Sequence, residues 1–275
     1  MSVEELIVYG KSKVTSTHAK MLLADILNVN PLELLTILDK QVEEEKIELY
    51  KKELEALQNN KPIQYVIGHV NFYGNPFFVT EDVLIPRFET EELVENVLEY
   101  SKQFMKENLS ILDLGCGSGI IGLTLKQKLP NSTVTMVDIS EKALEITRKN
   151  ALNLGLDVKV IKSDWFKDIP LQTYDIIVSN PPYIRTNEEI DPLVLQNEPA
   201  LALYGGVDGL DCYRSILKDI KKYSSNNTLI AFEIGYLQKE LLTEIVEKVF
   251  PSREIIVKKD LQGRNRMLFV LPKFV

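Results

Sequence analysis

The residues with the clearest capacity for chemistry are Asn180, Pro181, Pro182 and Tyr183, which follow the apolar run 174–179. A run of this length and composition predicts a buried strand, and two prolines cannot extend the hydrogen-bond ladder of a strand. The strand should therefore end in a stiff turn at the carboxyl edge of a sheet. Open α/β sheets bind their ligands at that edge.

This turn would carry several hydrogen-bond acceptors and one aromatic ring. The amide oxygen of Asn180 and the neighbouring backbone carbonyls accept hydrogen bonds, and the Tyr183 ring offers a face for stacking. Together these groups suit a planar NH2 group, so the turn indicates chemistry on a nitrogen. Asn-Pro is also a common turn sequence, and the functional interpretation therefore depends on a cofactor site elsewhere in the chain.

A glycine-rich segment upstream has the composition of a nucleotide-binding loop. Its residues, in chain order, are Asp113, Gly115, Cys116, Gly117, Ser118 and Gly119. Glycines let the backbone approach a ligand closely where the first strand turns into a helix. Asp138 lies at the end of the next expected strand, where its carboxylate would hold ribose hydroxyls. These features predict an adenosine-containing cofactor, and a purely structural loop is the less favoured alternative.

The loop by itself fits two classes of cofactor. Gly117, Gly119 and Gly122 satisfy the G-x-G-x-x-G spacing of dinucleotide-binding proteins, so a dehydrogenase stays open from the loop alone. Asp113 favours S-adenosyl-L-methionine, because a carboxylate suits its positive methionine end better than it suits a pyrophosphate. The turn that grips an amino group favours the same cofactor, since hydride transfer has no evident need for such a turn.

Asp164 and Trp165 follow the next expected strand, at 157–162. We expect the Asp164 carboxylate to accept a hydrogen bond from the adenine amino group and the Trp165 ring to pack on adenine. A core or boundary position is the structural alternative for Trp165, the only tryptophan in the chain.

A regular alternation of strands and helices from Leu109 onward would bring these residues to one sheet edge. Strands are expected at 109–114, 132–138, 157–162, 174–179, 227–234, 253–259 and 266–271, and helices near 118–129, 140–153, 208–223 and 236–249. Alternation of this kind predicts an α/β fold with a mostly parallel sheet and helices on both faces. No helix separates the last two strands, so they should pair antiparallel.

The rest of the chain predicts two further parts. Residues 1–61 have the pattern of a small helical domain, with helices at 18–27, from Pro31 and at 41–57. Residues 62–84, with the apolar Tyr65, Val66 and Ile67 before a Gly-Asn-Pro turn, predict a β-hairpin linker to a catalytic domain at 85–275. The helical domain is either a packing appendage or a module that docks a macromolecular substrate.

Composition excludes several other classes of protein. The chain of 275 residues has a formal net charge of −8 and a sequence pI of about 5.1, which argues against broad attachment to phosphate backbones. Two cysteines give no disulfide framework, and with the two histidines they indicate no metal site or nucleophilic triad. The first residues have no signal-peptide core, and no apolar run approaches the length of a membrane span. We expect a cytoplasmic protein with no membrane and no direct nucleic-acid partner.

These motifs together resemble the class I methyltransferases and, more closely, the HemK/PrmC family. The matching strings are 113–119, 180–183, 198–203, 205–211 and 233–235. The segment 86–91, Pro-Arg-Phe-Glu-Thr-Glu, resembles the Pro-Arg-Pro-Glu-Thr-Glu of the family, from which Phe88 departs. The segment 260–266 resembles the closing motif of the family, with Asn265 where an acid is usual.

The resemblance implies a Rossmann-like methyltransferase domain with seven strands that uses S-adenosyl-L-methionine. It also implies the substrate: the side-chain amide of the glutamine in the Gly-Gly-Gln motif of class I peptide chain release factors. Asn180 and the Pro181 carbonyl would accept the two amide hydrogens, and Tyr183 would pack against the glutamine side chain. No dedicated base is expected, because the methylated amide should lose its proton to water.

Three other functional interpretations fit parts of this pattern. The same turn serves enzymes that methylate an amino group of adenine or guanine in nucleic acid. A relative that methylates a glutamine of a ribosomal protein shares the catalytic domain. A cofactor-binding protein without catalytic activity would need the glycine loop and not the turn.

Overall fold

The computed structural model describes residues 1–273, which form two compact units. The helical unit comprises Met1–His69 and Asp191–Asn197, and the sheet unit comprises Val70–Ile190 and the chain from Glu198 onward. Each unit has a hydrophobic core of its own. The functional division into docking domain, linker and methyltransferase domain stays a prediction.

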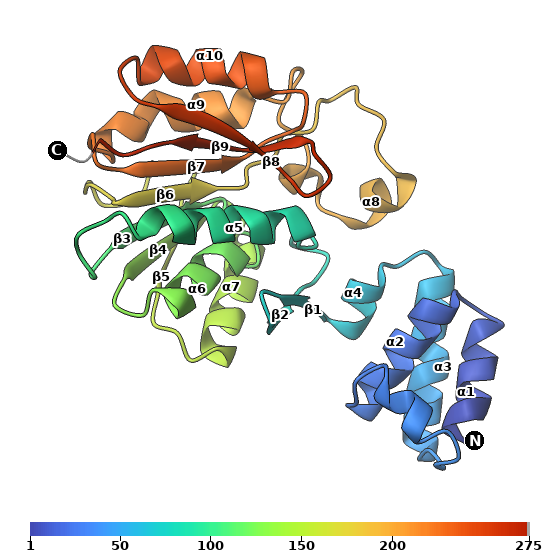
Figure 1. Cartoon of the computed structure of the whole chain (residues 1–275). Coiled ribbons are helices and arrows are strands. Elements are labelled where there is room, and N and C mark those ends of the chain that lie inside the picture. Colours follow the sequence, from blue (N-terminus) through green and yellow to red (C-terminus); the bar gives the residue numbers. More distant parts are fainter. Residues whose placement is uncertain (274–275) are drawn as a thin grey trace. The chain divides into compact units, whose positions relative to one another are not determined.

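Short helices make up the helical unit, and those that precede residue 68 pack around one apolar core (Figure 1). They are α1 (Val3–Lys11), α2 (Ser16–Leu27), a 3-10 turn (Glu33–Thr36), α3 (Glu44–Gln58), α4 (Ile63–Ile67) and α8 (Pro192–Asn197). Ser2 and Glu5 form a capping box, in which each side chain accepts a hydrogen bond from the backbone N–H of the other. Thr15 caps α2, since its hydroxyl accepts from the backbone N–H of His18 at 3.2 Å.

Two expectations for this region are wrong. The helix expected from Pro31 is only the 3-10 turn Glu33–Thr36. Tyr65, Val66 and Ile67 belong to α4 and not to the hairpin. This helix lies between Pro62 and the left-handed Gly68 (φ +77°), and its five residues are too few to show a helical period in the sequence.

The hairpin itself consists of β1 (His69–Phe72) and β2 (Asn75–Phe78). Tyr73 and Gly74, between the strands, both have positive φ, at +51° and +82°. Two such residues are the requirement of a tight hairpin turn. The rings of Phe72 and Phe77 meet edge to face, with centroids 6.0 Å apart, and both are buried in the core of the sheet unit.

All seven expected strands of the main sheet are present. They are β3 (Ser110–Leu114), β4 (Thr133–Asp138), β5 (Lys159–Lys162), β6 (Ile176–Ser179), β7 (Leu229–Glu233), β8 (Ile255–Lys259) and β9 (Asn265–Val270). Their order is β5-β4-β3-β6-β7-β9-β8, and β9 runs antiparallel to both β7 and β8. The expected antiparallel pairing of the last two strands is confirmed, as is the mostly parallel sheet.

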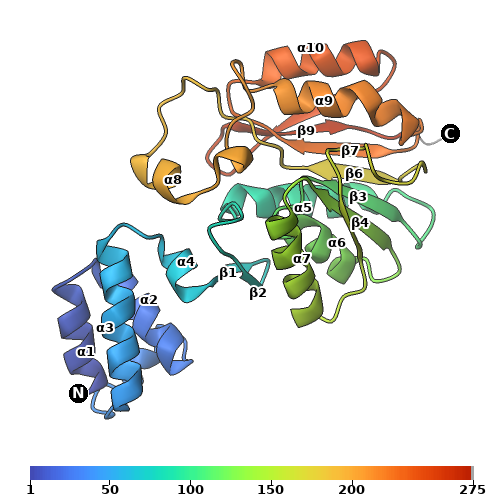
Figure 2. The ribbon, with the colours of Figure 1, turned by 180° about the vertical axis from the view of Figure 1, so that it is seen from behind.

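Helices cover both faces of this sheet (Figures 1 and 2). Those on one face are α5 (Phe88–Ser101), α6 (Ile120–Lys128) and α7 (Glu141–Asn153), and those on the other are α9 (Asp211–Asp219) and α10 (Lys239–Val249). Alternate strand residues serve the two faces: Ile111 and Val178 belong to one core, and Leu112 and Ile177 to the other. No helix of the described chain, residues 1–273, is long and apolar enough to span a lipid bilayer.

The strand order reverses direction next to β3. The chain leaves β3 toward β4 on one side and later returns to β6 on the other side, so the loops after β3 and β6 diverge. Such a switch point opens a crevice at the carboxyl ends of the strands. The glycine loop and the Asn-Pro-Pro-Tyr turn therefore border the same crevice.

Candidate active site

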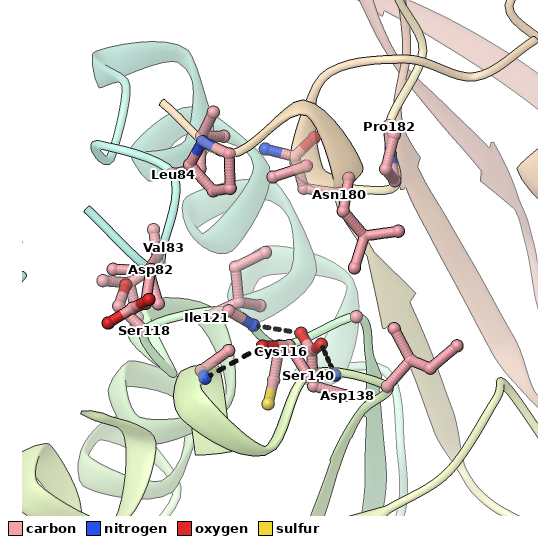
Figure 3. Close-up of a pocket in the computed structure, with 18 of the residues that line it drawn as sticks. Asp82, Val83, Leu84, Cys116, Ser118, Ile121, Asp138, Ser140, Asn180 and Pro182 are labelled. Carbon is pink, nitrogen blue, oxygen red and sulfur yellow. Dashed lines mark hydrogen bonds between the residues drawn. The ribbon is translucent and has the colours of Figure 1, made fainter. Parts of the chain in front are cut away.

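A cavity of about 290 Å³ opens in the sheet unit at the carboxyl ends of β3, β4, β5 and β6. Its size is near the lower end of the range for small-molecule sites, about 300–1,000 Å³. Its wall includes, of the predicted site residues, Gly115, Cys116, Gly117, Ser118, Asp138, Asp164, Trp165, Asn180 and Pro182. Figure 3 shows Asn180 and Pro182 across the cavity from Cys116, Asp138 and Ser140.

The glycine loop lines the cavity at Gly115 and Gly117, whereas Gly119 does not reach the lining. Gly115, Gly117 and Gly119 have φ values of +68°, +56° and +86°, a region that residues with a side chain rarely adopt. The loop is fixed from outside by Thr147, whose hydroxyl donates to the Gly117 carbonyl at 2.8 Å. The buried thiol of Cys116 lies 3.6 Å from the Thr147 hydroxyl, so Cys116 fills space beside the loop. The glycines are thus required by backbone shape at the predicted positions.

Asp138 joins this loop to the end of β4. One carboxylate oxygen accepts from the backbone N–H of Gly117 and the other from that of Ser140, both at 2.9 Å (Figure 3). Burial raises the pKa of Asp138, and these backbone hydrogen bonds partly oppose that rise. Each oxygen keeps a second lone pair, so the carboxylate can still accept from ligand hydroxyls in the cavity.

Asp164 and Trp165 form the next part of the wall. The Asp164 carboxylate pairs with Lys167 at 2.5 Å, and Trp165 has a left-handed backbone with φ +53°. The Trp165 ring lies over the loop: a Cβ built on Gly115 would meet it at 3.4 Å. An indole at this wall offers a flat apolar surface. The predicted contacts of both residues with adenine remain predictions.

Asp113 lies behind the loop and is not among the residues that line the cavity. It is fully buried, and one carboxylate oxygen accepts from the backbone N–H of Gly122 at 2.9 Å. Its other oxygen has no hydrogen-bond partner within the described residues 1–273. Burial raises the pKa of Asp113 to about 7. In the structure Asp113 stabilises the segment after the glycine loop through its hydrogen bond with Gly122. Its contact with the cofactor stays a prediction.

The Asn-Pro-Pro-Tyr turn divides between the cavity and the core. Asn180 and Pro182 line the cavity, whereas Pro181 is buried and Tyr183 does not reach the lining. The Tyr183 hydroxyl donates to the carboxylate of Glu233 at 3.2 Å. Burial raises the pKa of Tyr183 above its ordinary value, and the nearby Glu233 adds to the rise. The expected packing of Tyr183 against a substrate remains a prediction.

A polar network that begins at the cavity wall with Thr90 and continues into the core holds this turn in place. Asn180 donates its side-chain N–H to the Thr90 hydroxyl at 3.3 Å, and Thr90 donates to Glu233 at 2.7 Å. Arg266 donates to the Tyr183 hydroxyl at 3.3 Å. From the sequence, the segments 86–91 and 233–235 are identified only as strings that resemble the family, and nothing in the sequence connects Thr90 with Glu233.

A second link fixes the segment before α5. Arg87 and Glu198 form an ion pair, and the other Glu198 oxygen accepts from the backbone N–H of Ile85 at 3.0 Å. The Glu198 side chain is 2% exposed, so both oxygens depend on these partners. The link joins 86–91 to 198–203, two segments that were each matched to the family and not to each other. Both segments line the cavity, one with Pro86 and Arg87 and the other with Pro199, Leu201 and Ala202.

A doubly wound sheet with a glycine loop after its first strand and an Asn-Pro-Pro-Tyr turn after its fourth defines a class I methyltransferase. A solved T. thermophilus 16S rRNA methyltransferase in complex with AdoMet and guanosine shares the fold, with a TM-score of 0.55, 17% identity and coverage of 74% of this chain and 50% of that one. The family model for the methyltransferase small domain matches residues 90–198, and that for the PrmC N-terminal domain matches residues 12–68.

Similarity to characterised families extends over almost the whole chain. It is 40% identical to the release factor glutamine methyltransferase of Streptococcus pneumoniae, over 97% of this chain and 94% of that protein. The corresponding Bacillus subtilis protein is 36% identical over 92% of this chain and 90% of its own length. The chain belongs to the PrmC/HemK family of release factor glutamine methyltransferases.

Proposed function

We propose that this protein transfers a methyl group from S-adenosyl-L-methionine to the side-chain amide nitrogen of the glutamine in the Gly-Gly-Gln motif of class I peptide chain release factors. The observation that carries the proposal is the position of Asn180 at the wall of a cavity whose opposite side is a glycine loop. An acceptor for an NH2 group and a nucleotide-type site thus share one space. Near full-length similarity to release factor glutamine methyltransferases supports the choice of acceptor.

The cavity fits the cofactor in its shape and its polar groups. The backbone of Gly115 and Gly117 carries no side chain toward the cavity, Asp138 offers carboxylate oxygens for ribose hydroxyls, and Trp165 offers a flat surface for adenine. Apolar side chains, among them Val83, Leu84, Ile120, Ile121 and Ile139, complete the lining. When bound, S-adenosyl-L-methionine supplies a methyl group with electrophilic character.

The protein's own contribution is to hold a poor nucleophile. An amide nitrogen reacts weakly because its lone pair is delocalised into the carbonyl, as in the peptide bond. The Asn180 amide oxygen and the Pro181 carbonyl accept the two N–H groups of the glutamine amide and aim its nitrogen into the cavity. Such positioning lowers a barrier by roughly 7–11 kcal/mol at best. The same acceptors stabilise the positive charge that develops on the nitrogen, and the proton leaves to water.

The helical unit is proposed to dock the release factor, and the reaction is proposed to take place in the cytoplasm. Both cysteines, Cys116 and Cys212, are free thiols, which suits a reducing compartment. The match of residues 12–68 to the PrmC N-terminal domain supports a family-specific role for this unit.

Incubation with radiolabelled S-adenosyl-L-methionine and a purified release factor tests the proposal. A matched copy of the factor, with the glutamine of its Gly-Gly-Gln motif replaced, runs beside it. Label on the normal factor alone establishes the reaction and the acceptor together. Label on nucleic acid or on a ribosomal protein, and none on the release factor, would overturn the proposed acceptor and retain the methyltransferase class.

A further inference from the structure

The Asn180 side chain can do its proposed work in only one of two orientations. Its amide has an oxygen on one side and an NH2 on the other, and the two halves have nearly the same shape. With the oxygen toward the cavity it accepts from a substrate NH2 group. With the NH2 toward the cavity, the N–H donors of Asn180 face the N–H donors of the substrate, and the two groups repel each other. Packing distinguishes these rotamers poorly, so hydrogen-bond polarity has to select one.

Arg266, at the end of the network farthest from Asn180, decides which groups donate and which accept. Arg266 can only donate, and it donates to the Tyr183 hydroxyl at 3.3 Å and to the Asp260 carboxylate at 3.2 Å. The Tyr183 hydroxyl therefore accepts from Arg266 and directs its own proton to Glu233, 3.2 Å away. Glu233 thus receives its first hydrogen bond on one carboxylate oxygen.

Thr90 passes this polarity on to Asn180. Its hydroxyl has one proton, and it lies 2.7 Å from the second oxygen of Glu233, which as a carboxylate can only accept. With its proton committed there, Thr90 can only accept from Asn180, and the Asn180 NH2 lies 3.3 Å from it. Thr90 and Glu233 are each 1% exposed. Thr90 is also part of the cavity wall, whereas Glu233 does not reach the lining, so the Thr90–Glu233 hydrogen bond lies on the buried side of Thr90.

We propose that Thr90, directed by Glu233, is a positioning residue that holds the Asn180 amide with its oxygen toward the cavity. The proposal rests on the proposed function, because it explains how the site selects an acceptor that carries an NH2 group. Thr90 does not touch the reacting atoms in this scheme; it acts through Asn180. The hydrogen bond from Arg266 makes the Tyr183 hydroxyl donate to Glu233, and this fixes which group donates and which accepts in each hydrogen bond of the series.

The test compares Thr90→Val with Thr90→Ser in the release factor assay. Valine keeps the size of threonine and removes the hydrogen-bond acceptor, whereas serine keeps the hydroxyl. We expect Thr90→Val to lower kcat roughly 100-fold, the cost of a misplaced reacting group, with little change in KM for the release factor or in the Kd for S-adenosyl-L-methionine. Thr90→Ser should restore kcat to within about fivefold of wild type. Glu233→Gln should lower kcat as well. The glutamine NH2 can donate to the Thr90 hydroxyl, which frees the Thr90 proton to donate to Asn180 and turns the NH2 of Asn180 toward the cavity.

A second readout follows the Asn180 amide itself. In protein labelled with ¹⁵N-asparagine, the side-chain NH2 signals of Asn180 are those absent from Asn180→Ala. Thr90→Val should shift these signals and speed their exchange with water, and Thr90→Ser should leave them close to wild type.

The outcomes separate this inference from the proposed function. Wild-type kcat in Thr90→Val, or unchanged Asn180 signals in it, would overturn the positioning role while the proposed function stands. An equal loss of cofactor affinity and kcat in both Thr90 variants would also overturn it, because that pattern marks a general packing defect. A wild-type protein that labels no release factor would overturn both.

Discussion

The two sides of the cavity are held in place by different means. On the cofactor side, closely spaced glycines supply the shape, and the hydrogen bond that anchors them, from Gly117 to Asp138, spans 21 residues of sequence. On the acceptor side, Asn180 is held by Thr90, which is 90 residues from it in sequence, and Thr90 is held by Glu233, which is 143 residues from Thr90. The first side is made of backbone and local sequence, and the second of side chains that only the tertiary fold brings together. Substitutions on the two sides should therefore damage different steps.

Replacement of Asn180 should have the largest effect. Asn180→Ala removes an acceptor aimed at the substrate nitrogen, and the loss of one such preorganised group costs roughly 100- to 1,000-fold in kcat. Cofactor affinity should change much less, because the loop on the opposite side keeps its glycines and Asp138. Release factor methylation measures the first quantity, and calorimetric titration with S-adenosyl-L-methionine the second. Full activity in this variant would remove Asn180 from the mechanism.

The buried carboxyl behind the loop should make stability depend on pH. The pKa of Asp113 rises from 3.8 to about 7 on folding. The folded chain thus binds this proton more tightly than the unfolded chain, so the contribution of Asp113 to stability falls as pH rises from about 4 to about 7 and is constant above. Each unit of pKa difference corresponds to about 1.4 kcal/mol, and the sum should reach roughly 2–4 kcal/mol.

Asp113→Asn tests this expectation, because asparagine does not titrate and its oxygen can still accept from the Gly122 N–H. Urea unfolding at pH 5 and pH 8 should show wild type losing more stability than the variant between the two values. Parallel losses in both proteins would show that Asp113 does not titrate in this range.

The contrast between the two sides also explains what the sequence could predict. The strands were placed correctly because each is an apolar run that must be buried, and the loop because glycine at Gly115 and Gly117 answers a local backbone requirement. Thr90 and Glu233 gave no such signal, since a hydroxyl at a helix start and a carboxylate at a strand end satisfy ordinary local roles. The prediction that Tyr183 faces the substrate uses only its aromatic ring. The hydrogen-bond partners of its hydroxyl, Glu233 and Arg266, lie far away in the sequence and could not be predicted from it.

The loop conformation should matter for cofactor affinity in particular. Gly117 (φ +56°) has open space where a Cβ would lie, so Gly117→Ala adds backbone strain and places a methyl group at the cavity wall. We expect S-adenosyl-L-methionine affinity to fall about tenfold or more, from strain of roughly 1–2 kcal/mol and lost space. Gly263 (φ +80°) also has open space, in a turn that does not line the cavity. Gly263→Ala should therefore lower stability alone, and an equal loss of affinity in both variants would refute a local effect.

The ion pair between Arg87 and Glu198 should give the smallest effect of the four. Glu198→Gln keeps an acceptor for the Ile85 N–H and removes the charge that faces Arg87, so it should cost about 1–2 kcal/mol of unfolding free energy. Glu99→Gln makes the same chemical change in an exposed pair, Glu99–Lys102, and should leave the urea midpoint unchanged.

Because Glu198 holds residues 85–87 at the wall that Asn180 shares, Glu198→Gln should also slow release factor methylation more than it weakens cofactor binding. That pattern would place the segment 86–91 on the acceptor side of the cavity in functional terms as well as structural ones. A loss confined to cofactor affinity would instead show that residues 86–91 serve cofactor binding together with the glycine loop, which would contradict their placement on the acceptor side.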